Sequence, residues 1–219
     1  GAVDAYQRAV NVLNKYRVWD KVPQSVRDFM VNADPGQLPP SQAELTQRPY
    51  QLYRVIGPHV MLDAAMAKAM ELGLNAAIFA TSLNDVEARP AGEILGEVSQ
   101  EIEIFGRPLS PPCALICGGE VVVAVGQETG RGGRNQEFVL GASPRIAGSK
   151  NVVIGSIDSD GTDGPTDIAG GIVDGSTAER IKGSGFDLAE ELRHHNTTPV
   201  LDAIGDAVMI GNTGTNLRD

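Results

Sequence analysis

The chain has 219 residues, of which 42% are hydrophobic and 21% charged, as in an ordinary globular protein with a buried core. Its 18 lysines and arginines stand against 28 aspartates and glutamates, which gives a formal net charge of −10. This acidic balance leaves no general basic surface and argues against nucleic acid or an anionic membrane as the main partner. No apolar run approaches the length of a membrane span and no signal peptide opens the chain, so we expect a cytoplasmic protein.

The first half of the chain is predicted to be mainly helical. The apolar spacing predicts four helices, at residues 3–16, 23–29, 58–73 and 94–102. Two strands are expected, at residues 52–56 and 76–80, and the second of them is expected to be buried. The polar segment 32–48 contains Pro-Gly and Pro-Pro pairs, and we therefore predict a loop or linker there.

The second half is predicted to alternate strands with short helices. Strands are expected at residues 114–117, 121–125, 152–157 and 207–210. Helices are expected directly after residue 133 and around residues 178–181, 188–192 and 201–204. A long loop rich in aspartate and glycine covers residues 158–171. This alternation favours an α/β fold with a largely parallel sheet, and the proline-rich segment 106–112 is the expected domain boundary.

The cysteines and histidines give little sign of a reactive site. Cys113 and Cys117 lie four residues apart in an apolar segment, so strand alternation places them on one face but too far apart to bond easily. Two thiols do not make a zinc site, and we predict buried structural thiols in a reducing compartment. His59, His194 and His195 have no partner pattern and are predicted to be surface residues.

The segment Gly-Arg-Gly-Gly-Arg-Asn-Gln-Glu at residues 130–137 is predicted to bind an anion. Glycines let the backbone turn tightly with several N–H groups pointing one way, and the following helix adds its positive end. Arg131 and Arg134 bring planar donors that match carboxylate or phosphate oxygens. The plain alternative is a surface turn that ends in a capped helix.

An acidic loop, Asp158–Asp167, directly follows a predicted strand, the position where ligands bind in open α/β sheets. Its first three carboxylates, within six residues, persist most easily when they hold a cation or accept backbone hydrogen bonds. The alternative is a rigid loop stapled by Asx-turns. An EF-hand is excluded because Thr162, Asp163 and Ala169 occupy the positions that need an acidic or amide residue, glycine and glutamate.

The same loop resembles the first motif of the haloacid dehalogenase-like phosphatases. In that interpretation Asp158 is the nucleophile and Asp160 the acid/base, with Mg²⁺ between them. However, that fold builds its core after this motif, and few residues follow here.

Four motifs in order resemble the carboxyl-terminal MOFRL domain of the class II glycerate kinases, some of whose members are labelled hydroxypyruvate reductases. They are Cys-Ala-Leu-Ile-Cys-Gly-Gly-Glu (113–120), the Gly-Arg segment (130–137), Asp-Gly-Thr-Asp-Gly-Pro-Thr-Asp (160–167) and Gly-Asn-Thr-Gly-Thr-Asn (211–216). Residues 16–23, Tyr-Arg-Val-Trp-Asp-Lys-Val-Pro, resemble the family's amino-terminal domain. The resemblance implies the end of a Rossmann-like α/β/α domain at residues 1–108, followed by a smaller α/β MOFRL domain at 109–219 with a mixed, largely parallel sheet.

The resemblance also implies a function. It is the ATP-dependent phosphorylation of D-glycerate with Mg²⁺, giving 2-phosphoglycerate, at an active site in the cleft between the two domains. The family's signature arginine falls on Arg134, expected to bind the substrate carboxylate or the transferring phosphoryl group, with Asp160 as the second catalytic residue. Asp160 and Asp163 are the candidate metal ligands. The candidates for binding substrate or phosphate are Gly118, Gly119, Glu120, Arg131, Gly132, Gly133, Asn135, Gln136, Glu137, Thr162, Thr215 and Asn216.

One departure from the family limits what this chain can do. The family's glycine- and serine-rich nucleotide loop and its essential lysine have no counterpart here, and the chain opens on Gly1 rather than methionine. We therefore expect about the second half of the enzyme, which on its own binds glycerate weakly and turns over negligibly. The expected partners are D-glycerate, ATP and the missing amino-terminal part of the same protein, and a homodimer is left open.

Two further functions remain as alternatives. An NAD(P)H-dependent hydroxypyruvate reductase needs a dinucleotide fingerprint, which the Gly-Arg segment only partly imitates. The other alternative is a non-catalytic module that binds a carboxylate metabolite or a partner domain. Such a module needs no nucleotide site and no catalytic residue.

Overall fold

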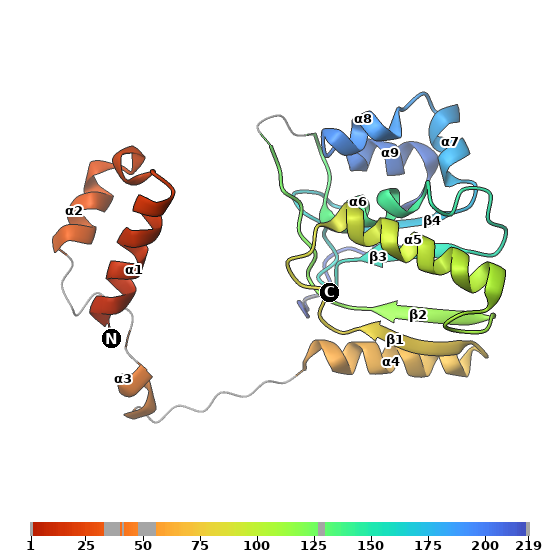
Figure 1. Cartoon of the computed structure of the whole chain (residues 1–219), viewed down its shortest axis with the longest axis horizontal. Helices are drawn as coiled ribbons and strands as arrows, with labels where there is room; N and C mark the ends of the chain where they lie inside the picture. Colours follow the sequence, from red (N-terminus) through yellow and green to blue (C-terminus); the bar gives the residue numbers. More distant parts are fainter. Residues whose placement is uncertain (1, 33–39, 41, 48–55, 127–129, 218–219) are drawn as a thin grey trace. The chain divides into compact units, whose positions relative to one another are not determined.

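The structure of the chain, a computed structural model, describes residues 2–32, 40, 42–47, 56–126 and 130–217. Its contacts divide the chain into two compact units, residues 1–54 and 55–219 (Figure 1). The strand predicted at residues 52–56 lies outside the described residues except for Ile56, which is in neither helix nor strand.

The first unit is helical. It contains α1 (Ala2–Lys15), the short 3-10 helix η1 (Trp19–Lys21), α2 (Gln24–Asn32) and α3 (Gln42–Gln47). The first and third of these confirm the helices predicted at residues 3–16 and 23–29. The loop predicted at residues 32–48 is wrong at α3, because glutamine, alanine, glutamate and leucine favour a helix even beside a proline-rich segment.

The second unit begins with a parallel two-stranded sheet of β1 (Asn75–Ala80) and β2 (Cys113–Cys117). α5 (Ala88–Phe105) connects the two strands, as a parallel pair requires a crossover. α4 (Pro58–Glu71) packs against this sheet, and Pro58 takes the first helical position, where no backbone N–H is needed. These elements confirm the predictions for this part of the chain, although β1 is half-buried rather than buried.

The two cysteines predicted to be buried thiols lie on β2 and are less buried than predicted. Cys113 and Cys117 are unbonded and half-buried. Burial raises the pKa of both thiols above its usual value, so neither thiol is activated as a nucleophile.

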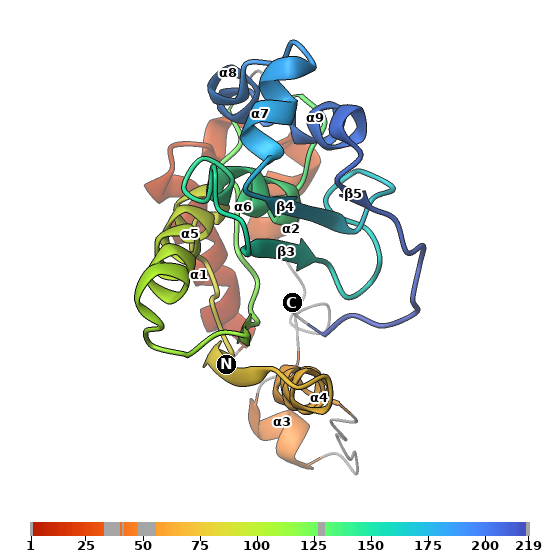
Figure 2. The same ribbon diagram turned by 90° about the vertical axis from the view of Figure 1, so that its right-hand side faces the viewer.

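The rest of the unit forms an antiparallel sheet covered by helices (Figure 2). Its strands, in the order β3-β4-β5, are β3 (Val153–Ile157), β4 (Gly170–Asp174) and β5 (Ala207–Val208). The helices are α6 (Arg134–Ala142), α7 (Thr177–Gly183), α8 (Leu188–Arg193) and α9 (Thr197–Ile204). The α/β class is confirmed, with one parallel and one antiparallel sheet. A loop without a helix joins β3 to β4, so β4 can only return antiparallel to β3.

Three predictions in this part differ from the structure. Residues 121–125 do not form a strand, because Val122 makes only an isolated bridge to Glu87 at the start of α5. β4 begins inside the loop predicted at residues 158–171, where the sequence predicts no strand, because Gly170-Gly171 are residue types that disfavour strands. A Cβ atom on Gly170 would lie 2.0 Å from the Ser156 carbonyl oxygen, so close approach to β3 requires glycine there. β5 is shorter than the predicted strand at 207–210.

The core of the second unit surrounds α6. Every residue of this helix from Asn135 to Ala142 is buried, and its apolar side chains pack against β3, β4, α5 and α9. Contact with α5 is close, since a Cβ atom on Gly92 would lie 1.9 Å from the Phe138 carbonyl oxygen. Asn135, Gln136 and Glu137 are therefore polar residues inside the core, and each needs a partner there.

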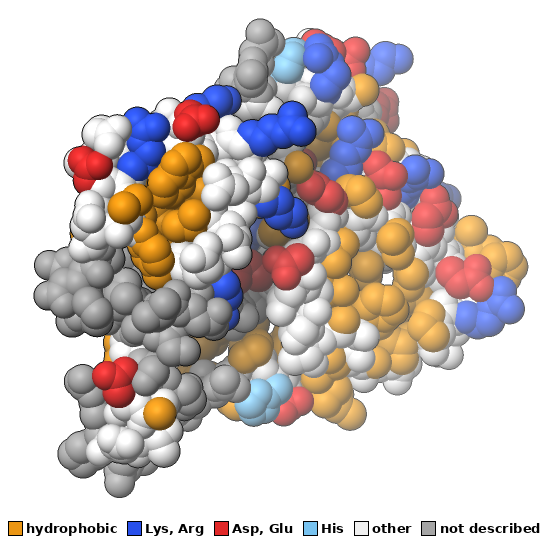
Figure 3. Space-filling model, turned by 60° about the vertical axis from the view of Figure 1, so that its left-hand side comes forward, with side chains coloured by type: hydrophobic (Ala, Val, Ile, Leu, Met, Phe, Trp, Pro, Cys, Tyr) orange, Lys and Arg blue, Asp and Glu red, His pale blue; other side chains and the backbone are white. Residues whose placement is uncertain are grey.

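The outer surface carries charges of both signs. Figure 3 shows lysine, arginine, aspartate and glutamate side chains intermixed on the face that it draws. One such group links α5 to the end of α6, where Arg145 pairs with Glu93 at 3.0 Å and with Glu97 at 3.2 Å. Among the helices of the described residues, none is both long and apolar enough to cross a bilayer.

Candidate active site

The Gly-Arg segment leads directly into α6, and a side chain from the acidic loop caps this helix. Gly133 is the N-cap residue, and Asp163 supplies the acceptor that glycine lacks. The Asp163 Oδ1 atom accepts hydrogen bonds from the Asn135 backbone N (3.1 Å) and Nδ2 (3.2 Å), and Oδ2 accepts one from the Gln136 backbone N (2.9 Å). Asp163 is fully buried, and burial raises the pKa of its carboxyl group while these donors lower it. The two predicted loops are thus joined at the start of α6.

Close packing explains the glycine at position 133. A Cβ atom there would lie 2.3 Å from the Asp163 Cγ atom, so the capping carboxylate occupies the space of a side chain. At Gly132 a Cβ atom would meet the Thr197 hydroxyl oxygen at 2.3 Å and the His195 carbonyl oxygen at 2.6 Å. Both glycines are therefore needed for the segment to pack closely against its neighbours, independently of any anion that their backbone amides bind.

Arg134, the first residue of α6, reaches back to the acidic loop. Its Nη2 atom lies 2.7 Å from Oδ2 of Asp158, which is buried at the start of the loop. Its Nη1 atom lies 3.7 Å from Oε1 of Glu120, beyond hydrogen-bond distance. Arg134 Nε is buried and has no hydrogen-bond partner in the described part of the chain. The guanidinium is held at one edge and keeps donor capacity at the other.

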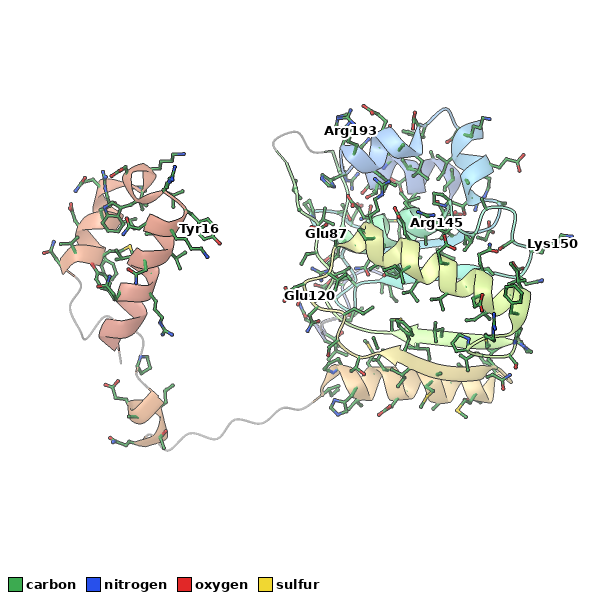
Figure 4. All side chains as sticks on the ribbon, in the orientation of Figure 1. Tyr16, Glu87, Glu120, Arg145, Lys150 and Arg193 are labelled. Atoms are coloured by element: carbon green, nitrogen blue, oxygen red, sulfur yellow. The ribbon has the colours of Figure 1, made fainter. Side chains whose placement is uncertain are left out.

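A pocket of about 590 Å³ opens beside this arginine. Five of the predicted site residues line it: Glu120, Gly132, Gly133, Arg134 and Glu137. Asp85 and His195 also line it, together with apolar residues of the segment 121–125. Figure 4 shows Glu120 and Glu87 at the end of the unit where α5 begins, and the Ala124 amide donates to Glu87 there. A pocket of this size with few polar groups suits a small metabolite.

The pocket contains an acid–imidazole pair that sequence reasoning missed. His195 Nδ1 lies 2.5 Å from Glu137 Oε1, and Glu137 is only 4% exposed. Burial raises the pKa of Glu137, while the hydrogen bond from His195 lowers it. The prediction of a surface position is wrong for His195, which is half-buried, because its partner lies far away in the sequence. It is confirmed for His59, whereas His194 is half-buried beside Glu190.

Two predicted binding residues on α6 are engaged by the protein itself. The Gln136 Oε1 atom accepts hydrogen bonds from the hydroxyl groups of Thr197 (3.3 Å) and Thr198 (2.7 Å). The Asn135 Oδ1 atom accepts one from Ser156 at 2.5 Å, and its Nδ2 donates to Asp163. These bonds join α6 to α9 and β3, and a role in binding substrate stays a prediction.

Three other predicted residues lie away from the pocket. Arg131 is half-exposed and pairs with the exposed Asp167. Gly119 has φ +148, and a Cβ atom on it would lie 2.2 Å from the Leu83 backbone N, so this position needs glycine for the chain to turn after β2. Gly118 is buried against Leu62 of α4.

The remaining predicted residues form a second cluster. Asp160 Oδ1 accepts hydrogen bonds from the Thr162 backbone N (2.9 Å) and hydroxyl (3.0 Å), which is an Asx-turn. The Thr213 amide donates to the Asp160 carbonyl, and the Thr215 hydroxyl donates to the Ser159 carbonyl, each at 3.0 Å. The segment 211–216 therefore lies along the acidic loop, as a shared site requires, with Asn216 exposed.

The geometry does not support a metal site at the predicted ligands. Both oxygens of Asp163 are occupied by the cap of α6, and one oxygen of Asp160 by its own turn. Within the described ranges no group of three or more histidine, cysteine, aspartate or glutamate residues is arranged to hold a metal ion. The metal assignment stays a prediction for Asp160, and Asp163 has a structural role instead.

Comparison with known proteins shows what this chain is similar to. Residues 113–219, which contain β2, the second sheet, its helices and both loops, match the MOFRL family. The chain is 40% identical over 211 residues to the D-glycerate 2-kinase of Thermotoga maritima, covering 96% of the chain and 48% of that protein. It is 36% identical over 213 residues to the glycerate 2-kinase of Pyrococcus horikoshii, covering 97% and 48%.

A solved structure agrees with these relatives. The crystal structure of glycerate kinase from Thermotoga maritima matches with a TM-score of 0.76 and 38% identity, over 97% of this chain and 48% of that one. The chain is therefore similar, over nearly its whole length, to proteins named glycerate kinase or glycerate 2-kinase. It spans about half the length of the curated relatives it matches.

Proposed function

We propose that this chain is part of an ATP-dependent kinase that transfers a phosphoryl group to D-glycerate and yields 2-phosphoglycerate. Relatives named glycerate 2-kinase and D-glycerate 2-kinase match nearly the whole chain. The observation that carries the proposal is Arg134, which lines a metabolite-sized pocket, is held by buried Asp158 and keeps part of its side chain exposed.

Arg134 is suited to phosphoryl transfer. This reaction depends on positioning and on cationic donors more than on covalent chemistry with the protein. Asp158 fixes one edge of the guanidinium, and the buried Nε atom costs about 1–3 kcal/mol while it lacks a partner. The exposed part of the side chain, 29% of it, faces the pocket, and its planar donors would bind and orient a carboxylate or phosphoryl oxygen there.

ATP and Mg²⁺ are the proposed cofactors of the complete protein. We propose that the residues which bind ATP lie in the part of the relatives' length that this chain does not span. In this chain Asp160 keeps one carboxylate oxygen outside its turn, but Asp163 does not fit as a second metal ligand. We therefore derive no step through the metal from these residues.

The domain organisation is part of the same proposal. We propose that residues 1–108 end a Rossmann-like domain, that residues 109–219 form the MOFRL domain, and that the active site lies in the cleft between them. The MOFRL match begins at residue 113, close to that boundary, whereas contacts group residues 55–219. A cytoplasmic location and assembly as a homodimer also stay proposals.

The test uses the complete protein that carries this chain. With ATP, Mg²⁺ and D-glycerate, ³¹P NMR should show 2-phosphoglycerate and ADP forming together. Arg134→Ala should lower kcat by about 10²–10³-fold, as loss of one transition-state donor does. Arg134→Lys keeps the charge that pairs with buried Asp158 but loses the planar donors, so it should fold yet stay well below wild type.

Arg193→Ala is the matched control, since Arg193 is an exposed arginine on α8 (Figure 4) whose ion pair among the described residues is with its neighbour Glu190. This variant should keep the wild-type rate. A complete protein that transfers no phosphate to glycerate, or an Arg134→Lys variant as active as Arg193→Ala, would overturn the proposal.

A reductase and a phosphatase remain as alternatives with their own tests. The name hydroxypyruvate reductase is carried by a relative of 32% identity, and NADH oxidation on adding hydroxypyruvate would favour it. A phosphatase needs Asp158 as an accessible nucleophile, yet this carboxylate is buried against Arg134. Calorimetry that shows glycerate binding without turnover would favour the non-catalytic module.

A further inference from the structure

We propose that His195, held by Glu137, is the general base that accepts the proton of the substrate hydroxyl in the Arg134 pocket. This inference rests on the proposed function, because it concerns the acceptor hydroxyl of the same reaction. It assigns a catalytic role to a residue that the sequence motifs do not include.

The backbone places His195 beside the Gly-Arg segment. The Gly130 amide donates to the His194 carbonyl at 2.6 Å, and the His195 carbonyl lies where a Cβ atom on Gly132 would clash. The segment therefore packs directly on the turn that carries the imidazole. His195 and Arg134 line the same pocket. Arg134 belongs to the Gly-Arg segment itself, and His195 lies on the turn against which that segment packs.

The hydrogen bond to Glu137 sets the tautomer of the imidazole. An ionised Glu137 accepts the proton on Nδ1, which leaves the lone pair of a neutral ring on Nε2. In the part of the chain that the structure describes, no hydrogen bond to Nε2 is found. A carboxylate behind an imidazole also stabilises the imidazolium that forms when the ring takes a proton.

The proposed step balances with the proposed reaction. The hydroxyl oxygen of glycerate forms a bond to the γ-phosphorus of ATP, and its O–H bond breaks as the proton moves to His195 Nε2. The electron pair of the broken phosphorus–oxygen bond leaves with ADP. Arg134 binds the substrate carboxylate or the transferring group, so its role and that of His195 are separate.

Two features show that this pair is built into the fold. His195 has φ +55, a conformation uncommon for residues other than glycine, which asparagine, aspartate and histidine adopt more often than the rest. Glu137 is buried in α6, where an unpaired carboxylate would be costly. Other charged or titratable groups around the pair are Asp85, Glu87, Arg89, Glu120, Arg134, Asp163, Glu190, Glu191 and His194.

The test measures pH profiles of the complete protein. His195→Asn keeps a residue that tolerates positive φ but removes the titrating ring, so kcat/KM should fall by about 10²-fold or more and its acid limb should disappear. Glu137→Gln removes the charge that stabilises the imidazolium, and should move the acid limb to lower pH. His194→Asn is the control and should leave rate and profile unchanged.

Ring ¹⁵N NMR gives a readout besides activity. At high pH, His195 should be the tautomer protonated at Nδ1, and Glu137→Gln should weaken this preference. A tautomer protonated at Nε2, or a His195→Asn variant that keeps both the wild-type rate and the acid limb, would overturn the assignment of His195 as general base. Neither result would contradict the proposed kinase function. Loss of stability in His195→Asn with an unchanged profile would show a structural role and also overturn that assignment. A wild-type protein that does not phosphorylate glycerate would overturn both proposals together.

Discussion

Removal of the carboxylate at Asp163 tests how the site is held together. This side chain accepts three hydrogen bonds at the start of α6 and is fully buried. Replacing a capping residue by alanine costs about 0.5–2 kcal/mol, and each buried donor left unpaired costs about 1–3 kcal/mol more. Partial access of water reduces this sum, so we expect Asp163→Ala to lower the free energy of unfolding by about 3–5 kcal/mol.

Two further variants separate the cap from other effects. Asp163→Asn keeps the shape and an acceptor for Asn135, but places an NH₂ group against the Gln136 amide, and should cost about 1–3 kcal/mol. Asp167→Ala, in the same loop, removes an exposed ion pair and should cost less than about 0.5 kcal/mol.

Urea denaturation followed by far-UV circular dichroism gives these values. The only tryptophan, Trp19, belongs to the first unit, so circular dichroism is the more direct probe of α6. If Asp163→Ala were as stable as Asp167→Ala, the buried carboxylate would not be holding the helix, and our account of the site would be wrong.

Three other perturbations have defined outcomes. Gly161→Ala would place Cβ 1.9 Å from a carbonyl oxygen, whereas Gly214→Ala, also at positive φ, meets nothing within 4 Å. Both variants strain the backbone, so hydrogen exchange of residues 211–217 should rise in both and more in the first. Gly92→Ala would force α5 away from α6 and should lower Tm by several degrees in calorimetry. Hydrogen bonds from Ser176 lower the pKa of Asp174 in the folded protein. The ionised carboxylate therefore stabilises the fold above its unfolded pKa of about 4, and this stabilisation is lost as the pH falls through the folded pKa. Asp174→Asn should flatten that part of the stability–pH curve in acid titrations.

The α-helices other than α3, and the strands β1, β2 and β3, could be predicted from the sequence because their signals are local. The apolar spacing in α5 and Gly57-Pro58 before α4 operate within a few residues. The failures involve residues whose conformation is set by distant partners. Valines at 121–125 favour a strand, yet their backbone meets the start of α5. Gly170 and Gly171 disfavour a strand, yet only glycine fits against the neighbouring groups.

The site divides in the same way. Arg134 and the glycines before it could be recognised as a candidate anion site, since the residue types that such a site needs are adjacent in one short segment. The partners of Asp163 and His195 could not, because each lies in another part of the sequence and only the tertiary fold brings the groups together. One signal was available in the sequence. The three residues after Arg134 are polar and occupy consecutive positions of a helix, so they cannot all face solvent and at least one of them must find a partner inside the protein.

The close packing of α5 on α6 has a consequence for how the protein is divided. Similarity to the MOFRL family starts at residue 113, so α5 lies outside the matched range and α6 inside it. Their backbones nevertheless touch at Gly92 and Gly141, with no side chain between them. A polypeptide cut at residue 113 would expose the apolar side of α6 that α5 covers, and we expect it to aggregate rather than fold. The first residue of the family match is therefore a boundary of sequence similarity and not of the packed core. A shortened protein for expression or crystallisation should keep α5 together with α6.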